Sequence, residues 1–297
     1  MPRLSYYLKN KKKFLKLKIR KGIPDSLRGE VWKKISNVEY IMNSNLYNEL
    51  LNRINDEEIP DEDVIIKDMH RTFPANIIFR NQLGPGQRTL YRICSCLSLK
   101  NKKIGYAQGM SFIIAMFLFY EDEETSFWMM ENLLKNYSLK DMFCSGFPGL
   151  KKNFFVMLKL MKRLLPNIFK QFLKFDIPPP LYASSWYLTS FTNNIFPHEI
   201  TRRVFDCYLM EGIKIIHRFS LGVLALKERE ILSTKNNSEV FVVLSKLNQN
   251  INFDSLFAKS FSFSISRKEI EKYECLYTAH LKGKIPGDED IMNQIKI

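Results

Sequence analysis

The sequence predicts an all-α protein with no significant β-sheet. Apolar residues recur at three- and four-residue spacing along most of its 297 residues. Glycine and proline separate these periodic stretches, and sustained two-residue alternation between hairpin turns is missing. The 45% hydrophobic content is ample for a packed core, and the length exceeds that of a typical single-core domain. We therefore expect either one large helical domain or two closely packed helical lobes, and the two-lobe arrangement is the one we adopt.

Several helices are expected in the first 120 residues. Pro24 and Asp25 supply a start signal, and the breaker LGPGQ precedes a later helix. A helix through Asp68 should end near Phe73, because a proline at the next position disfavours helical backbone in the residue before it. The 11-residue apolar run MSFIIAMFLFY at 110–120 is too short for a bilayer span of roughly 20 residues, so it indicates a buried helix. The periodic apolar sets are Leu27, Val31 and Ile35; Leu46, Leu50 and Ile54; and Leu90, Ile93 and Leu97.

Later helices are expected in NFFVMLKLMKRLL, which Pro166 ends, in LYASSWYLTSFTNN at 181–194, and in HEITRRVFDCYLMEG, which Gly212 ends. The triple proline at 178–180 suggests a border between an N-terminal lobe reaching about residue 178 and a C-terminal lobe from about 179. A tight connection between two helices would give the same pattern. Residues 233–297 are expected to add helices that complete the C-terminal lobe.

The formal net charge of +14 is placed unevenly. Residues 1–24 contain nine Lys or Arg and no acid, which defines a basic N-terminal arm over residues 1–19. Charge alone does not choose between nucleic acid, anionic lipid, an acidic protein surface and a solvated arm without a ligand.

The sequence lacks the motifs that are typical of several kinds of chemistry. The chain contains no GxxxxGK[ST] phosphate loop and no GxGxxG after a strand, so we expect it to bind no nucleotide by itself. It has four scattered histidines, no HExxH and no zinc-ligand spacing, so no metal site is expected. Without a GxSxG elbow, a self-contained hydrolase is disfavoured.

Three short stretches stand out from the core-forming residues. In RKGIPDSLRGEVW, Arg28 and Trp32 lie four apart on one helix face, which predicts a structural contact between them. In IIKDMHRTFP, Asp68 and Arg71 can form an i, i+3 ion pair, which on an ordinary surface is worth less than about 1 kcal/mol. In IGYAQGM, Gln108 precedes Gly109, where a polar amide is often a helix cap and a glycine permits close approach of a partner.

Together and in this order, these stretches resemble the TBC domain family, whose members activate Rab-type small GTPases. The resemblance runs from about Arg20 to about Leu232. It comprises R-x-G-I-P-x-x-L-R-G-x-x-W at 20–32, I-x-x-D-x-x-R at 65–71, Y-x-Q-G-M at 106–110, a tryptophan segment around Trp186, and D-x-x-L-x-E-G from Asp206.

The resemblance implies a GTPase-activating protein that regulates vesicle trafficking and has no cofactor of its own, because the partner GTPase carries GTP and Mg²⁺. It assigns an arginine finger to Arg71 and a glutamine finger to Gln108. It makes Asp68, Tyr106 and Gly109 supporting residues. Structural roles fall on Arg28, Trp32, Trp186 and Asp206. On this interpretation the chain contributes catalytic residues in trans and is not itself an enzyme.

Two other functions remain as alternatives. One is a TBC-like scaffold that binds a GTPase or another partner without accelerating hydrolysis. The other is a basic nucleic-acid-binding helical protein, although no regular aromatic and basic interleaving is visible and no specific nucleic acid is expected. We expect a cytoplasmic protein, and the basic arm suggests peripheral contact with anionic endomembranes. The particular Rab cannot be read from signature residues.

Overall fold

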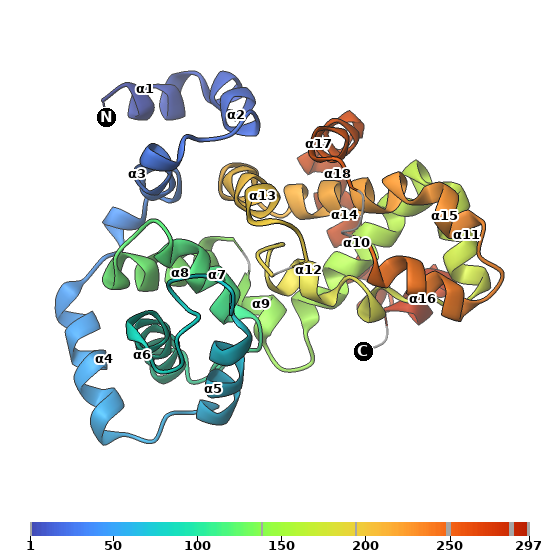
Figure 1. The fold of residues 1–297 in the computed structure, drawn as a ribbon. Helices are drawn as coiled ribbons and strands as arrows, with labels where there is room; N and C mark the ends of the chain where they lie inside the picture. Colours follow the sequence, from blue (N-terminus) through green and yellow to red (C-terminus); the bar gives the residue numbers. More distant parts are fainter. Residues whose placement is uncertain (1, 138, 194, 248–250, 285–287, 296–297) are drawn as a thin grey trace. The chain divides into compact units, whose positions relative to one another are not determined.

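The computed structural model describes residues 2–137, 139–193, 195–247, 251–284 and 288–295, and every regular element among them is a helix (Figure 1). The all-α prediction is therefore confirmed. The chain divides into two compact units, which are described separately. The first comprises Met1–Ser145 and Leu188–Gly212, and the second Gly146–Tyr187 and Ile213–Ile297.

The first unit contains the expected early helices. Pro24 precedes α3, and Gly84 with Pro85 begins α6, as the start signals predict. The apolar run forms α7, in which residues 110–117 are all buried. The helices of this unit are α1 (Pro2–Asn10), α2 (Lys12–Arg20), α3 (Asp25–Ser36), η1 (Val38–Tyr40), α4 (Ser44–Asp56), α5 (Glu62–Arg71), α6 (Pro85–Lys100), α7 (Met110–Leu118), α8 (Glu123–Asn136), α9 (Leu139–Phe143) and α13 (His198–Glu211).

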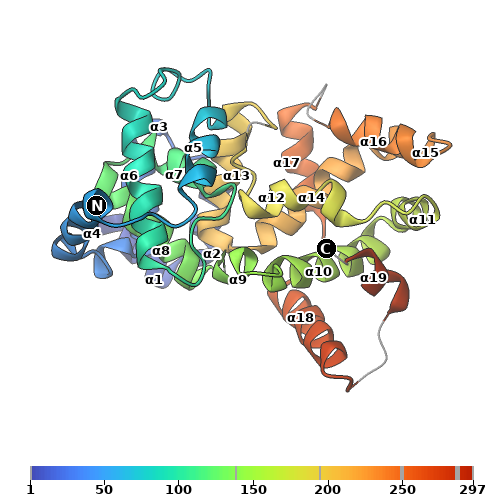
Figure 2. The same cartoon turned by 90° about the horizontal axis from the view of Figure 1, so that it is seen from below.

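The second unit is built around α10, against which α11, α14, α18 and α19 pack (Figure 2). Trp186 is buried here and its ring contacts that of Tyr182, with centroids 5.5 Å apart. The helices of this unit are α10 (Pro148–Leu164), α11 (Pro166–Lys174), η2 (Pro179–Leu181), α12 (Ser184–Leu188), α14 (Lys214–Leu226), α15 (Glu228–Leu232), α16 (Asn237–Ser245), α17 (Phe253–Ser262), α18 (Arg267–Leu281) and α19 (Glu289–Gln294).

Two expectations about local structure differ from what is observed. The helix predicted over 181–194 is reduced to the five residues of α12, because Ser190 and Phe191 adopt left-handed backbone with φ of 50° and 63°. Residue 194 of that stretch lies outside the described residues. The proline block at 178–180 opens the short helix η2 inside the second unit, as in a tight helix connection.

The basic N-terminal segment, which was expected to be an arm, is helical. It forms α1 and α2, drawn in dark blue in Figure 1, and α2 packs against α13 through Leu15 and Ile19. Among the described residues, no helix has both the length and the apolar character needed to cross a bilayer.

Candidate functional site

The arginine of the IIKDMHRTFP stretch is the last residue of α5. Ile65 and Met69 anchor the helix in the core, and the chain leaves it at Thr72 with extended backbone. Phe73 then adopts φ of 45° and packs its ring against those of Phe112 and Phe119. Arg71 is thereby fixed at a helix end with a half-exposed side chain, as the proline at position 74 predicts.

Asp68 is buried one turn behind Arg71 and joins three parts of the site. Its Oδ1 lies 2.5 Å from Nη2 of Arg71, and the two side chains are 2% and 45% exposed, respectively. Its Oδ2 accepts hydrogen bonds of 2.8 Å from the Tyr106 hydroxyl and of 2.8 Å from the Gly109 amide. The buried carboxylate therefore connects the end of α5 to the loop that precedes α7.

The YAQGM loop is shaped by Gly109, whose φ of 100° disfavours any residue with a side chain. A Cβ added there would also lie 3.2 Å from Cγ2 of Thr189. The loop has a second anchor in Asp61, whose Oδ2 accepts from the Tyr106 amide over 3.1 Å. Two carboxylates, that of Asp61 just before α5 and that of Asp68 in its last turn, thus hold the loop from Tyr106 to Gly109.

Tyr106 extends this network into the core. Burial raises the pKa of its phenol well above the ordinary value, so the hydroxyl keeps its proton and donates to Asp68. The same oxygen accepts from the Ser111 amide over 3.2 Å. The Ser111 hydroxyl in turn accepts from Thr72 over 2.8 Å, which ties the residue after Arg71 to the first turn of α7.

Arg71 and Gln108 face each other at the surface. Both side chains are exposed, and with its amide oxygen turned to Arg71, Gln108 accepts from both terminal guanidinium nitrogens over 2.8 and 2.6 Å. The opposite amide orientation would set the NH₂ group against guanidinium donors. The structure therefore brings together, in one unit, two predicted site residues that lie far apart in the sequence.

A second network joins the N-terminal motif to α13. The Asp206 carboxylate is fully buried and accepts from Arg28 Nε over 3.0 Å and from Trp32 Nε1 over 2.8 Å. Burial raises the pKa of Asp206, and the Arg28 guanidinium offsets part of that shift. Arg20 adds a two-bond ion pair with Glu211, at 2.7 and 2.8 Å.

The cation–π contact of Arg28 is with Tyr120: the guanidinium lies 5.1 Å from the centroid of that ring. Arg28 and Trp32 are connected through the Asp206 carboxylate, which accepts a hydrogen bond from each of them. The buried carboxylate accepts from both donors at once, so neither the Arg28 Nε–H nor the Trp32 N–H is left without a partner. Arg28 and Trp32 are both buried, which is compatible with the structural role expected of them.

An apolar groove lies between α5 and α6, on the helix that carries Arg71. Ile66 and Leu83 line it, at 38% and 69% exposure, with Met69 and Tyr91 beside them. Its volume is about 240 Å³. The sequence did not predict this groove. Ile66 lies in α5 and Leu83 in the loop before α6, and the spacing of apolar residues does not indicate that either side chain is exposed.

Sequence reasoning also gave no role to Asp61, Thr72 or Ser111. Thr72 directly follows the I-x-x-D-x-x-R stretch and is not one of its signature residues. Asp61 precedes α5 with φ of 60°, and its side chain makes no capping hydrogen bond to the helix. A signal did exist for Ser111, since it is a serine near the start of a long apolar run. A buried polar group of that kind needs a partner.

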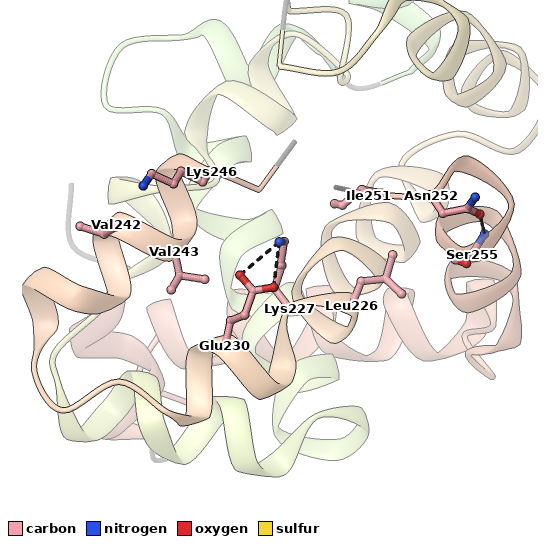
Figure 3. Close-up of a pocket in the computed structure, with 9 residues that line it drawn as sticks. All are labelled: Leu226, Lys227, Glu230, Val242, Val243, Lys246, Ile251, Asn252 and Ser255. Carbon is pink, nitrogen blue, oxygen red and sulfur yellow. Dashed lines mark hydrogen bonds and ion pairs between the residues drawn. The ribbon is translucent and has the colours of Figure 1, made fainter. Parts of the chain in front are cut away.

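The second unit has a larger cavity, of about 620 Å³, between the end of α14, α16 and the start of α17 (Figure 3). Lys227 and Glu230 form an ion pair at its wall, 2.9 Å apart. Within the described residues, no group of three or more His, Cys, Asp and Glu side chains is arranged to hold a metal ion.

Solved structures share this architecture. The Chlamydomonas flagellar RabGAP TBC domain superposes with a TM-score of 0.74 at 25% identity, covering 89% of this chain and 91% of that one. The Ypt/Rab-GAP domain of Gyp1p gives a TM-score of 0.70 at 15% identity over 93% and 98% of the two chains, which is a likeness of fold alone. The fold is that of a helical Rab-GAP domain.

The sequence matches the Rab-GTPase-TBC domain, RabGAP-TBC, over residues 25–232, and the chain belongs to this family. It is 33% identical to the Rab GTPase-activating protein tbc-11 of Caenorhabditis elegans over 261 residues, which is 86% of this chain and 28% of that protein. It is 35% identical to the growth hormone-regulated TBC protein 1-A of Danio rerio, over 75% of this chain and 62% of that one. The chain therefore spans less than two thirds of these relatives.

Proposed function

We propose that this protein activates a Rab-type small GTPase in its GTP-bound state by supplying Arg71 and Gln108 in trans to the nucleotide. The observation that carries the proposal is the exposed pair itself. Two side chains suited to phosphoryl transfer face each other at the surface, above the buried Asp68. The name of tbc-11 as a Rab GTPase-activating protein supports the same function.

Arg71 would act on the charge that builds on the transferring phosphoryl group. A guanidinium stays protonated and presents a planar fork to phosphate oxygens. Supplied in trans, such an arginine accelerates hydrolysis by about 10³ to 10⁵, or roughly 4 to 7 kcal/mol of barrier. The partner provides the GTP and Mg²⁺ in this scheme.

Gln108 would orient the attacking water in place of the GTPase's own glutamine. Its amide oxygen can accept from the water while its NH₂ group donates to phosphate or backbone. In the free protein that oxygen accepts from Arg71. When the guanidinium moves to the phosphate, the amide oxygen becomes available for water, so engagement of one finger releases the other.

Asp68 would act through Arg71 rather than on the nucleotide. Its carboxylate holds the guanidinium from behind, while its other oxygen is held by Tyr106 and Gly109. Such fixing reduces the entropy lost when the arginine is ordered in the transition state. The apolar groove of Ile66 and Leu83 lies on the same helix and is our candidate for contact with the GTPase surface beside the nucleotide.

The proposal is tested by single-turnover GTP hydrolysis across a panel of Rab GTPases. We expect stimulation to fall by about 100-fold or more with Arg71→Ala and with Gln108→Ala, while helical circular dichroism stays unchanged. Arg71→Lys should recover little, because an ammonium lacks the fork. Arg53→Ala is the matched control, since Arg53 also pairs with a nearby carboxylate, that of Glu57 directly after α4, at 2.5 Å.

A GTPase complex that forms without any acceleration would favour the scaffold alternative. If stimulation survived both Arg71→Ala and Gln108→Ala, the proposed roles would be wrong even though the family membership stands. Activity of the kind proposed is expected at the cytoplasmic face of endomembranes, where it would regulate vesicle trafficking.

A further inference from the structure

The two N-terminal helices present a face that the rest of the first unit does not cover. Leu15 and Ile19 of α2 are 8% and 3% exposed, and α2 packs against α13. Consecutive residues of an α-helix are turned by about 100°, so Leu17 points away from that buried edge. The opposite side of α2 therefore faces solvent.

This outer side carries large apolar side chains. Leu17 is 58% exposed and Phe14 46%, and Tyr6 of α1 is 52% exposed. The Phe14 ring stacks on that of Tyr7, with centroids 5.6 Å apart, which links the outer sides of the two helices. The surface has the aromatic and aliphatic groups that interfacial helices insert among lipid headgroups.

Lysines surround these apolar groups. Six lysines in and beside α1 and α2 are exposed: Lys9, Lys11, Lys12, Lys13, Lys18 and Lys21. Among the described residues, no carboxylate lies within ion-pair distance of their ammonium groups. Lys18 and Lys11 reach over the rings of Phe14 and Tyr6, at 5.3 and 6.0 Å from the centroids. No acidic residue occurs from residue 1 to residue 24.

We propose that α1 and α2 dock on the surface of an anionic lipid bilayer. Clusters of four to eight lysines on an amphipathic helix attract anionic headgroups, and Leu17 with Phe14 would enter the headgroup region between them. A nucleic acid would use the lysines but offers the exposed leucine no apolar environment. Arg20, with a guanidinium suited to phosphate, is instead bound to Glu211.

The test is flotation of the purified chain with phosphatidylcholine vesicles that contain or lack phosphatidylserine, without any GTPase. Two variants remove the two components of the face: Phe14→Ser with Leu17→Ser, and Lys13→Glu with Lys18→Glu and Lys21→Glu. Matched controls change exposed residues elsewhere: Tyr40→Ser with Leu281→Ser, and Lys268→Glu with Lys272→Glu and Lys282→Glu. Circular dichroism confirms folding of each variant.

We expect binding to phosphatidylserine vesicles to fall by about tenfold or more in both face variants and to change little in both controls. Equal binding to pure phosphatidylcholine, or equal loss in the Lys268 control, would overturn the proposal, because either would show that this face is not the determinant. Retained binding by Phe14→Ser with Leu17→Ser would show that charge alone accounts for the interaction, and this result would also contradict the proposal. GTP hydrolysis in solution should be unchanged by the face variants, so this test is independent of the finger residues.

Discussion

Arg71 and Asp68 form an ion pair in which the acid is buried and the base is half exposed, with 2.5 Å between Nη2 and Oδ1. We predict that Asp68→Asn lowers the maximal rate of GTP hydrolysis by about 10- to 100-fold, because an amide holds the guanidinium less firmly. Single-turnover kinetics at saturating activator measure this rate.

A double-mutant comparison separates positioning from general damage. If Asp68 acts through Arg71, Asp68→Asn should cost little further activity when Arg71→Ala is already present. Glu57→Gln, which weakens the Arg53 pair on α4, is the control and should leave the rate unchanged. Additive losses in the double variant would contradict a positioning role.

Gly109→Ala should destabilise the protein by about 1 to 2 kcal/mol and reduce GTPase activation. The φ of 100° disfavours alanine, and the new Cβ would approach Thr189 Cγ2. Urea unfolding measures the first effect and single-turnover hydrolysis the second. Gly146→Ala provides a control, because Gly146 has φ of 74° and open space around an added Cβ. This variant should lower the free energy of unfolding through backbone strain but leave GTPase activation unchanged.

Ile66→Lys and Leu83→Ser should raise the KM for the GTPase by about tenfold and leave kcat nearly unchanged. Both residues line the apolar groove beside α5, where a partner's apolar surface would bury them, and the groove lining includes neither Arg71 nor Gln108. Steady-state kinetics with varied GTPase concentration separate the two constants. A fall in kcat at constant KM would show that the groove serves catalysis rather than recognition.

The burial of His217 predicts that the protein loses stability in acid. Full burial lowers its pKa to about 3, and its Nδ1 lies 2.8 Å from the Tyr187 hydroxyl. The unfolded state, with a histidine pKa near 6.5, binds the proton more readily, so the stabilisation is present above about pH 6.5 and is lost as the pH falls toward 3. Between pH 7 and pH 5, His217 contributes on the order of 2 kcal/mol to the decrease in the free energy of unfolding.

Urea unfolding at the two pH values, with His217→Gln as comparison, measures that share. The variant should be less stable at pH 7 yet lose less stability on acidification. An identical pH dependence in both proteins would show that His217 is not the titrating group. Other groups cancel in the comparison because both proteins carry them.

Several helix starts and ends were predictable because proline, glycine and apolar spacing act locally. The end of α5 at Arg71 and the end of α13 before Gly212 are examples. The helix expected over 181–194 was not found at full length, because the left-handed backbone of Ser190 and Phe191 leaves no mark in an apolar pattern. The packing of α2 on α13 likewise depends on contacts remote in sequence.

The site was predictable where a residue has a family signature and not where it acts only as a hydrogen-bond partner. The signatures gave Asp68, Arg71 and Gln108, and the structure brings their side chains together. The bonds from Thr72 to Ser111 and from Tyr106 to Asp61 cross between segments, so spacing along the chain could not indicate them. The acceptor Asp206, which Arg28 and Trp32 share, is likewise remote from both in the sequence.

The most direct test of the central claim uses a responsive Rab GTPase whose own catalytic glutamine has been replaced by alanine. If Gln108 orients the water in trans, this GTPase should still be accelerated by the wild-type protein, by about 10³-fold or more, and should fail to respond to Gln108→Ala. Single-turnover GTP hydrolysis decides the matter. Loss of the response to the wild-type protein would contradict the account, because the water would then depend on the GTPase's own glutamine.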